Sequence, residues 1–511
     1  MNSRRPMDAT EQFQDQIDKQ NESLISTGND HLDYILGGGL SANCFVLIEG
    51  DPGVGKTTMA MQFALEGIRQ GESVLYLSLS EGEEELRSVA ASHGFDLEGL
   101  TIVDLSPGSE TLGADEATIF HPSEVELTEL TQAITNSFEE HQPNRVVIDT
   151  LRELRHLAQS DLRYRRQLIA LKAFFRAKDC TVLLIDDLLP DADLQLQGVV
   201  RGAIELQRHT PDYGRVRRRL QVTKMRGHVV RTGYHDFTIV RGGLAIYPRL
   251  VAAEHHTKFD HGAVSGGVPE LDELLGGGLQ RGTSTLIIGA AGTGKSSLTA
   301  NYAVASANQQ GRSAIFVFDE TAQNYLERCE GLNIPLRKYR DDGRITLRQV
   351  DSAELSPSEF AWHIRRIVEE DNVRFIAIDS LNGYMHSMPD DDYLRGQLHE
   401  LLSYLNGKGV TTLITLSQHG MVGDVESPVE TSYLADTNIL LRYFEHQGKV
   451  RKAISVIKKR TGGHEKAIRE LAFTSDGIRI GGPLTEFRGV LTGTPEYFGD
   501  ADPLLTAEDD R

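Results

Sequence analysis

The chain contains the same glycine-rich pattern twice. Residues 37–57 read GGGLSANCFVLIEGDPGVGKT, and residues 276–296 read GGGLQRGTSTLIIGAAGTGKS. In both copies GGGL precedes an apolar segment that ends in G-x-x-x-x-G-K-[ST], the pattern of a phosphate-binding loop between a strand and a helix. The two lysines of the pattern, Lys56 and Lys295, lie 239 positions apart, and its other positions keep the same offset. One such loop can arise by chance, whereas two in the same context predict a duplicated nucleotide-binding domain.

Each half alternates short apolar segments with amphipathic ones and ends in β-rich sequence. Continuous apolar strands between amphipathic helices are typical of a largely parallel sheet that is covered on both faces. The apolar segments are residues 44–50, 73–79, 101–105, 145–150 and 181–186, then 283–289, 313–319, 344–350, 374–380 and 410–416. The sequence therefore predicts an α/β fold in two tandem copies, with ligands at the carboxyl ends of the strands, where both loops fall.

The pattern also predicts where the domains begin and end. A polar lead-in and an acidic tail are expected to be disordered, and a polar, histidine-bearing linker is expected between two nucleotide-binding domains. The expected segments are the lead-in 1–21, the first domain 22–250, the linker 251–264, the second domain 265–490 and the tail 491–511.

Composition narrows the class of protein. Lys and Arg number 53 against 74 Asp and Glu, which gives a net charge of −21 and argues against a nucleic-acid partner. The basic run Arg215–Arg219 leaves two interpretations open, a solvated strand face or a patch for polyanions.

No segment has the roughly 20 apolar residues that span a bilayer, and the N-terminus has no secretory h-region. With three scattered cysteines, these features predict a cytoplasmic globular protein without disulfides.

The residues of the two loops form the predicted nucleotide site. Glycines allow main-chain N–H groups to converge on phosphates at a helix N-terminus. The lysine reaches the outer phosphates of ATP, and the following hydroxyl binds Mg²⁺. The candidate residues are Gly50, Gly53, Val54, Gly55, Lys56, Thr57 and Thr58, and Gly289, Gly292, Thr293, Gly294, Lys295, Ser296 and Ser297.

Carboxylates at the ends of other strands complete the predicted chemistry. Asp149 and Asp379 each end an apolar segment and are candidates, with Thr57 and Ser296, for the Mg²⁺ site. A helix cap is the alternative for such an aspartate.

Hydrolysis also needs a group that orients the attacking water. Glu81, Asp319 and Glu320 follow the strand after each loop helix and are the candidates, with surface carboxylates as the alternative.

Taken together, these residues resemble the KaiC-like family, the tandem RecA-like ATPases of the bacterial circadian clock. The resemblance extends from about residue 27 to residue 495. It is most specific in KMRG (224–227) with GYHDFTIVRGGLAIYPRL (233–250), and in SVIKKRTGGHEKAIRE (455–470). It implies a hexameric ring in which Lys224, Arg226, Lys458 and Arg460 reach the ATP of a neighbouring subunit.

The resemblance further implies serine/threonine autokinase and autophosphatase activity in the second domain. Ser432 falls at the family's phosphoserine position, with Thr431 beside it, whereas Tyr433 replaces the usual threonine. A capping cluster of hydroxyls is the alternative. The family has paired glutamates where this chain has Ser80 and Asp319 as first members, which weakens the expectation of hydrolysis in the first domain.

The implied role is a signalling or timing switch that assembles with itself and with KaiB-like or histidine-kinase-type proteins. Two other functions share the same core. One is a DNA-dependent ATPase of recombination, against which the net charge argues. The other is a nucleotide-sensing scaffold with little turnover, which Ser80 favours for the first domain.

Overall fold

The computed structural model of the chain divides into two compact units, Met1–Arg249 and Leu250–Arg511. The lead-in 1–21, the hydroxyl cluster around Ser432 and most of the tail lie outside the described residues. The structure describes residues 24–106, 123–188, 194–211, 214–309, 311–386, 391–418, 435–491 and 495–499.

The first unit is built on one nine-stranded sheet in its described residues, in the order β11-β10-β9-β8-β3-β7-β6-β4-β5. The strands from β8 to β5 in this order run parallel, and β9, β10 and β11 add antiparallel pairs. The strands are β3 (Phe45–Gly50), β4 (Val74–Ser78), β5 (Thr101–Asp104), β6 (Arg145–Asp149), β7 (Thr181–Asp187), β8 (Gly202–His209), β9 (Arg217–Met225), β10 (His235–Val240) and β11 (Gly243–Tyr247), with a separate pair β1 (Leu24–Ile25) and β2 (Leu40–Ser41).

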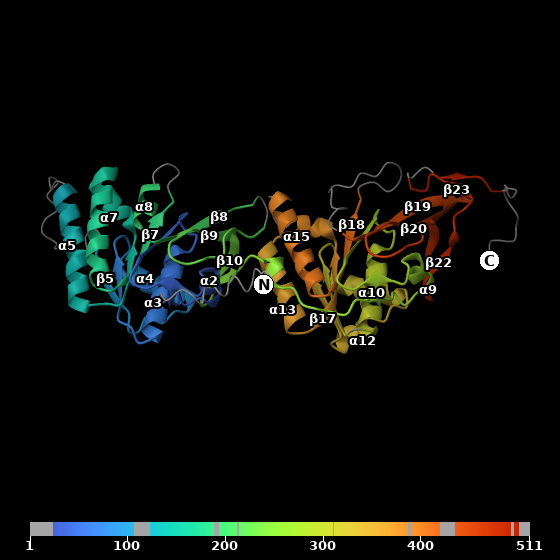
Figure 1. The fold of residues 1–511 in the computed structure, drawn as a ribbon, viewed down its shortest axis with the longest axis horizontal. Coiled ribbons are helices and arrows are strands. Elements are labelled where there is room, and N and C mark those ends of the chain that lie inside the picture. The colour runs from blue at the N-terminus through green and yellow to red at the C-terminus, as the bar shows by residue number, and fades with distance from the viewer. Residues whose placement is uncertain are drawn as a thin grey trace, which may run out of the picture. The chain divides into compact units, whose positions relative to one another are not determined.

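Helices cover both faces of this sheet (Figure 1). Side chains of α3 and α4 enter one core with Val46 and Ile48 of β3, and side chains of α5, α6 and α7 enter the other with Phe45 and Leu47. Successive residues of a strand point to opposite faces, so burial on both sides explains why Phe45–Ile48 are all apolar. The helices are α2 (Asp30–Ile35), α3 (Lys56–Arg69), α4 (Glu83–His93), α5 (Ser123–His141), α6 (Leu151–Ala158), α7 (Asp161–Arg176) and α8 (Leu194–Val199).

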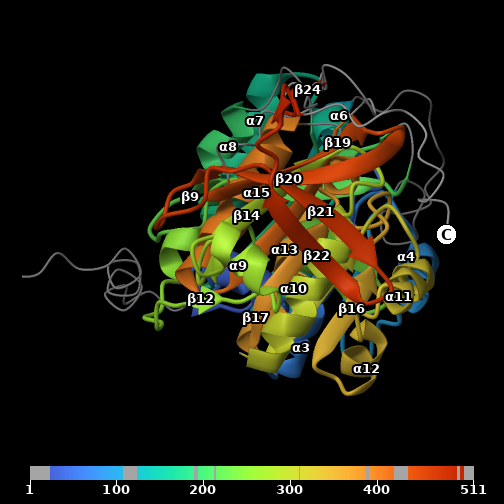
Figure 2. The same ribbon diagram turned by 90° about the vertical axis from the view of Figure 1, so that its right-hand side faces the viewer.

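The second unit repeats this topology in its described part, with the order β16-β15-β17-β18-β14-β19-β20-β21-β22. Figure 2 shows its antiparallel end, where β20, β21 and β22 lie side by side in red. The strands are β14 (Ser284–Gly289), β15 (Arg312–Val317), β16 (Ile345–Gln349), β17 (Val373–Asp379), β18 (Thr411–Ser417), β19 (Thr437–His446), β20 (Lys449–Lys459), β21 (Arg469–Thr474) and β22 (Gly477–Pro483), with the short pairs β12 (Ala263–Val264) and β13 (Leu279–Gln280), and β23 (Phe487–Arg488) and β24 (Glu496–Tyr497).

Two helical layers cover this second sheet as well. Helices α10, α11 and α12 pack on one face, and α13, α14 and α15 pack on the other. The helices are α9 (Pro269–Leu274), α10 (Lys295–Gln309), α11 (Ala322–Gly331), α12 (Leu336–Asp341), α13 (Pro357–Glu369), α14 (Leu381–Met385) and α15 (Asp391–Gly407), with the 3₁₀ turn η2 (Ala252–Glu254). The predicted α/β class, with two mostly parallel sheets flanked by helices, is confirmed.

The segment expected as a linker packs against the second unit. Ala252 is buried and its N–H donates to Glu400 at 2.9 Å, and the N–H of Thr257 donates to the Gly407 carbonyl at 3.1 Å. Phe259 lies so close to Gly409 that a Cβ there would be 2.5 Å from the ring. A side chain at position 409 would therefore displace the segment.

Candidate nucleotide sites

The two glycine-rich loops join a central strand to a buried helix in each unit. The first runs from the end of β3 to Lys56, the first residue of α3, and the second from β14 to Lys295, the first residue of α10. Gly55 and Gly294 have φ angles of 117° and 107°, a conformation that residues with a Cβ atom rarely adopt. A Cβ on Gly50 would lie 2.4 Å from the carbonyl oxygen of Leu206. The motif glycines are therefore required by the backbone geometry of the loop.

The lysine of each loop folds back over its own loop. Lys56 Nζ donates to the carbonyls of Gly50 and Asp51 at 2.7 and 3.0 Å and to Asp187 Oδ1 at 3.0 Å. Asp187 ends β7, beside β3, and was not identified from the sequence. It binds the lysine that the motif assigns to phosphate.

Among the described residues, the second lysine has no matching carboxylate contact. Lys295 Nζ donates to the carbonyls of Gly289 and Ala290, each at 2.9 Å. Burial lowers the pKa of Lys295, against the opposing effects of Asp379 and Asp319. Ser417 ends β18 at the place that Asp187 holds in β7. The two loops therefore present lysines with different partners.

The aspartates predicted for the metal lie beside the loop hydroxyls. Thr57 Oγ1 donates to Asp149 Oδ2 at 3.0 Å, and Tyr76, another residue missed from the sequence, donates to the same oxygen at 2.6 Å. Burial raises the pKa of Asp149, and these two hydrogen bonds partly offset it.

In the second unit, Asp379 Oδ1 accepts from Thr415 Oγ1 at 2.6 Å. Its Oδ2 is buried and has no hydrogen-bond partner among the described residues. Burial also raises the pKa of Asp379, against the hydrogen bonds from Thr415 and Ser296. One carboxylate and one hydroxyl fit Mg²⁺, which takes oxygen ligands and usually keeps several waters and substrate phosphates.

The three carboxylates proposed to orient water occupy different surroundings. Glu81 lines a cavity of about 450 Å³ with Lys56, Thr57 and Asp149. Burial, then the charges of Asp149 and Glu85, raises the pKa of Glu81.

The two candidate carboxylates of the second unit both accept hydrogen bonds from side chains. Asp319 accepts a hydrogen bond from Ser380, the residue after β17. Glu320 accepts two hydrogen bonds from Arg328, at 2.6 and 2.7 Å.

The four candidate trans cations lie near the first residues of the central strand of their unit, β3 or β14. The loop of the same unit follows the last residue of that strand. Lys224 pairs with Ala203 of β8, and Arg226 N donates to the carbonyl of Arg201. Arg201 N in turn donates to the carbonyl of Phe45, the first residue of β3, whereas the loop follows the last residue of that strand. Six residues of strand separate these points by about 17 Å.

The second unit has the same arrangement. Lys458 pairs with Asn438 of β19, and its Nζ donates to the Ala435 carbonyl at 2.9 Å. Arg460 forms an ion pair with Asp436 at 3.4 Å, and Asp436 N bonds the carbonyl of Ser284 at the start of β14. In both units these cations lie too far away to reach the loop of their own subunit.

Further cations gather around Arg226. A cavity of about 370 Å³ is lined by Arg226 with Lys172, Arg176 and Arg201, and no acidic residue contributes to its described lining. Burial lowers the pKa values of Lys172 and Lys224, and the Arg226 charge lowers them further. The positive charge at this end of the unit favours a bound anion.

Comparison with known protein families identifies the chain. A family model described as the KaiC ATPase matches residues 25–251 and again residues 264–485. The chain belongs to the KaiC ATPase family. The predicted resemblance and the tandem RecA-like architecture are confirmed, and membership supports ATP as the ligand and ATPase activity.

Curated relatives cover nearly the whole chain. A circadian clock protein KaiC3 of Synechocystis sp. is 26% identical over 503 residues, which is 95% of this chain and 97% of the relative. A circadian clock oscillator protein KaiC of Acaryochloris marina is 26% identical over 92% of this chain and 91% of its own length. Another, from Prochlorococcus marinus subsp. pastoris, is 27% identical over 93% and 94%.

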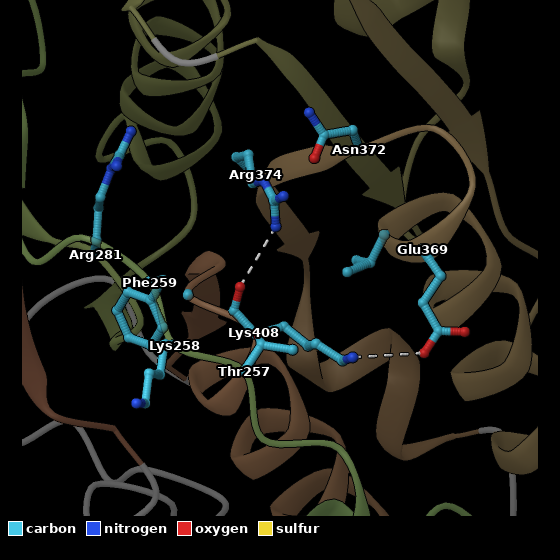
Figure 3. A pocket seen from close by; sticks show the side chains of 10 residues that line it. Thr257, Lys258, Phe259, Arg281, Glu369, Asn372, Arg374 and Lys408 are labelled. Atoms are coloured by element: carbon cyan, nitrogen blue, oxygen red, sulfur yellow. Dashed lines mark hydrogen bonds and ion pairs between the residues drawn. The ribbon is translucent and has the colours of Figure 1, made fainter.

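The second unit also contains a cavity of about 500 Å³ that lies away from its phosphate-binding loop. Figure 3 shows its lining, which includes Lys258, Arg281, Arg374 and Lys408. Lys408 forms an ion pair with Glu369 at 3.9 Å, and Arg374 donates to the Lys408 carbonyl at 3.4 Å. The cavity lies by the first residues of β17 and β18, whereas the phosphate loop that ends at Lys295 begins at the last residue of β14. It is therefore not the nucleotide site.

Two further predictions concern the phosphoacceptors and membrane-spanning helices. The candidate phosphoacceptors Thr431 and Ser432 lie outside them. Within them, no helix is long and apolar enough to cross a membrane.

Proposed function

We propose that the protein is a hexameric double-ring ATPase in which every nucleotide site is shared by two subunits. The observation that supports this most directly is the separation, by the length of β3 or β14, of each loop from the cations of its own chain. Cations at one end of a unit and a phosphate loop at the other form a head-to-tail interface, which closes into a ring when the rotation allows.

In the first ring, the loop amides and Lys56 bind the phosphates of ATP. Lys56 then exchanges its contacts with Asp187 and the loop carbonyls for the outer phosphates. Thr57 and Asp149 would hold Mg²⁺, which would neutralise phosphate charge. Glu81 orients the attacking water and accepts its proton, and its raised pKa brings it closer to the operating pH of a general base.

Lys224 and Arg226 act on the nucleotide of the neighbouring subunit. Positive charge placed on a transferring phosphoryl group increases the rate by about 10³–10⁵. Lys172, Arg176 and Arg201 add to the positive potential there. Lys458 and Arg460 have the same role in the second ring.

In the second ring we further propose transfer of the phosphoryl group to Ser432 or Thr431, and its later removal. Ala435, the first described residue after these hydroxyls, accepts from the trans cation Lys458. Ser432 lies only three positions before Ala435 in the sequence, which is why we propose the neighbour's ATP as the phosphoryl donor. The phosphorylation state and the ring then signal to protein partners, in keeping with relatives named circadian clock proteins.

Mixing two inactive variants tests the shared site. Both carry Lys295→Ala, so that turnover reports the first ring. One adds Lys56→Ala and the other adds Lys224→Ala with Arg226→Ala. Each is expected to be inactive alone. In random mixed rings about one quarter of the first-ring sites combine an intact loop with intact cations across a head-to-tail interface, so mixing should restore about that fraction of the parent rate.

Unmixed rings of each variant, and a native mass spectrum that counts subunits and bound nucleotides, serve as controls. A mixture that assembles with ATP bound but stays inactive would contradict the shared site. For the kinase activity, mass spectrometry after incubation with Mg-ATP should show phosphate on the Thr431–Ser432 peptide, and an unmodified peptide during turnover would refute it.

A further inference from the structure

The two units hold their candidate glutamates differently. Glu320 receives both arms of the Arg328 guanidinium, with Nη1 2.6 Å from Oε2 and Nη2 2.7 Å from Oε1. The two side chains are 35% and 23% exposed, for Arg328 and Glu320 respectively, so solvent only partly screens the pair. Such a fork fixes the orientation of a carboxylate as well as its charge.

Glu81 has no such partner. Its Oε2 is buried without a hydrogen-bond partner among the residues that the structure describes. The position that corresponds to Arg328 at the repeat offset of 239 is Val89, which lines the cavity of the first loop. An apolar side chain there leaves the first glutamate available to a water.

Arg328 is itself held by the element that contacts the second loop. It lies on α11 with its guanidinium carbon 4.7 Å from the centre of the Tyr325 ring. Tyr325 is buried, and its hydroxyl donates to the carbonyl of Ser296 at 2.9 Å. Thr321 caps the helix immediately after Glu320. Burial opposes the charge of Arg328, but Glu320 outweighs it and leaves the pKa of Arg328 raised. The fork is therefore stably charged and anchored to the loop.

We propose that Arg328 is a positioning residue that holds Glu320 away from the attacking water and so slows hydrolysis in the second ring. This inference rests on the proposed function. In hydrolysis the water oxygen bonds to the γ-phosphorus, the bond from that phosphorus to the β–γ bridging oxygen breaks, ADP leaves, and the water proton passes to a carboxylate. A glutamate whose two oxygens are engaged by Arg328 accepts that proton poorly. ATP then persists for transfer to a hydroxyl, while the first ring, with Glu81 unengaged, hydrolyses faster.

Turnover of the second ring alone tests this proposal. In a Lys56→Ala parent, Arg328→Val reproduces the environment of Glu81. We expect kcat to rise about tenfold, a fraction of the 10²–10⁴ that general-base catalysis contributes, with KM for ATP changed less than about twofold. Arg328→Lys keeps the charge but not the fork and should give an intermediate rise. Arg337→Val breaks a similar pair with Glu330 elsewhere in the unit and should leave kcat unchanged.

Two variants separate positioning from a structural effect. With Glu320→Gln added, Arg328→Val should no longer raise kcat. In a Lys295→Ala parent, Val89→Arg should lower kcat of the first ring by a similar factor. If Arg328→Val and Arg328→Lys unfold at the same temperature as the parent and bind ATP, but hydrolyse ATP no faster than the parent, the inference is wrong while the proposed function stands. A Lys56→Ala parent that binds no ATP at the second loop would refute the proposed function itself.

Discussion

The ion pair between Lys56 and Asp187 predicts that the first loop binds ATP against an internal competitor. The two side chains are 9% and 24% exposed and 3.0 Å apart. Because Lys56 must leave Asp187 before it can reach a phosphate, the energy of this contact is subtracted from ATP binding. Asp187→Asn keeps the shape of the side chain and removes its charge.

The expected gain follows from the loss of charge attraction. The asparagine side chain can still accept a hydrogen bond from the Lys56 ammonium, but the attraction between opposite charges is gone; it contributes about 0.2–1 kcal/mol in exposed ion pairs, and this pair is more buried than those. The amide should therefore reduce the energy needed to release Lys56 by about 1–1.5 kcal/mol. Since 1.4 kcal/mol corresponds to tenfold in affinity, ATP should bind the first site about five- to tenfold more tightly.

Titration calorimetry in a Lys295→Ala background isolates the first site. The reciprocal change Ser417→Asp, measured in a Lys56→Ala background, places a carboxylate at the matching end of β18 and should weaken the second site by a similar factor. Unchanged or weaker binding by Asp187→Asn would refute the competition and indicate that Asp187 contributes to the bound state.

Two other predictions concern single positions. Tyr76→Phe removes a hydrogen bond that stabilises ionised Asp149 and so raises its pKa beyond the effect of burial. The proposed role of Asp149 in holding Mg²⁺ needs its ionised form, which is lost as pH falls through the pKa. The acid limb of first-ring ATPase activity should therefore move to higher pH in a pH–rate profile, and an unmoved limb would contradict the assignment. Gly294→Ala places a Cβ 2.1 Å from the Phe473 ring at a φ of 107° and should abolish nucleotide binding at the second loop and cost about 1–3 kcal/mol of stability. Gly311→Ala has a φ of 118° and open space around it, so denaturant unfolding should show the backbone cost alone, with binding intact.

The strands and loops were predictable because their signals are local. Segments such as residues 44–50 and 283–289 are largely apolar because both faces of each strand are buried. The loops need glycine at positive φ and a lysine at the helix start, so the residues expected to bind phosphate lie next to one another in the sequence. Asp149 and Asp379 could be proposed because a strand-end aspartate after such a loop is itself a short-range pattern.

The partners of these residues were not predictable, because they come from segments that only the strand order brings together. Asp187 reaches Lys56 because β7 lies beside β3, and Tyr76 reaches Asp149 because β4 lies beside β6. The basic run Arg215–Arg219 was open to two interpretations. In the structure it enters β9, with Arg217 buried, so it is not simply a solvated face. No periodicity in the sequence indicates this.

The position of loop and cations at the two ends of one short strand has a consequence for assembly. Under the proposed sharing of sites, the loop of the last member of an open row of subunits lacks cations and the cations of the first lack a loop, so each layer of the row contains one complete site fewer than its members. Only closure supplies the missing one. Incomplete rings would then hold a defective site at each gap, and any shift of β3 along its axis would disturb two catalytic centres at once, its own and that of the adjoining protomer.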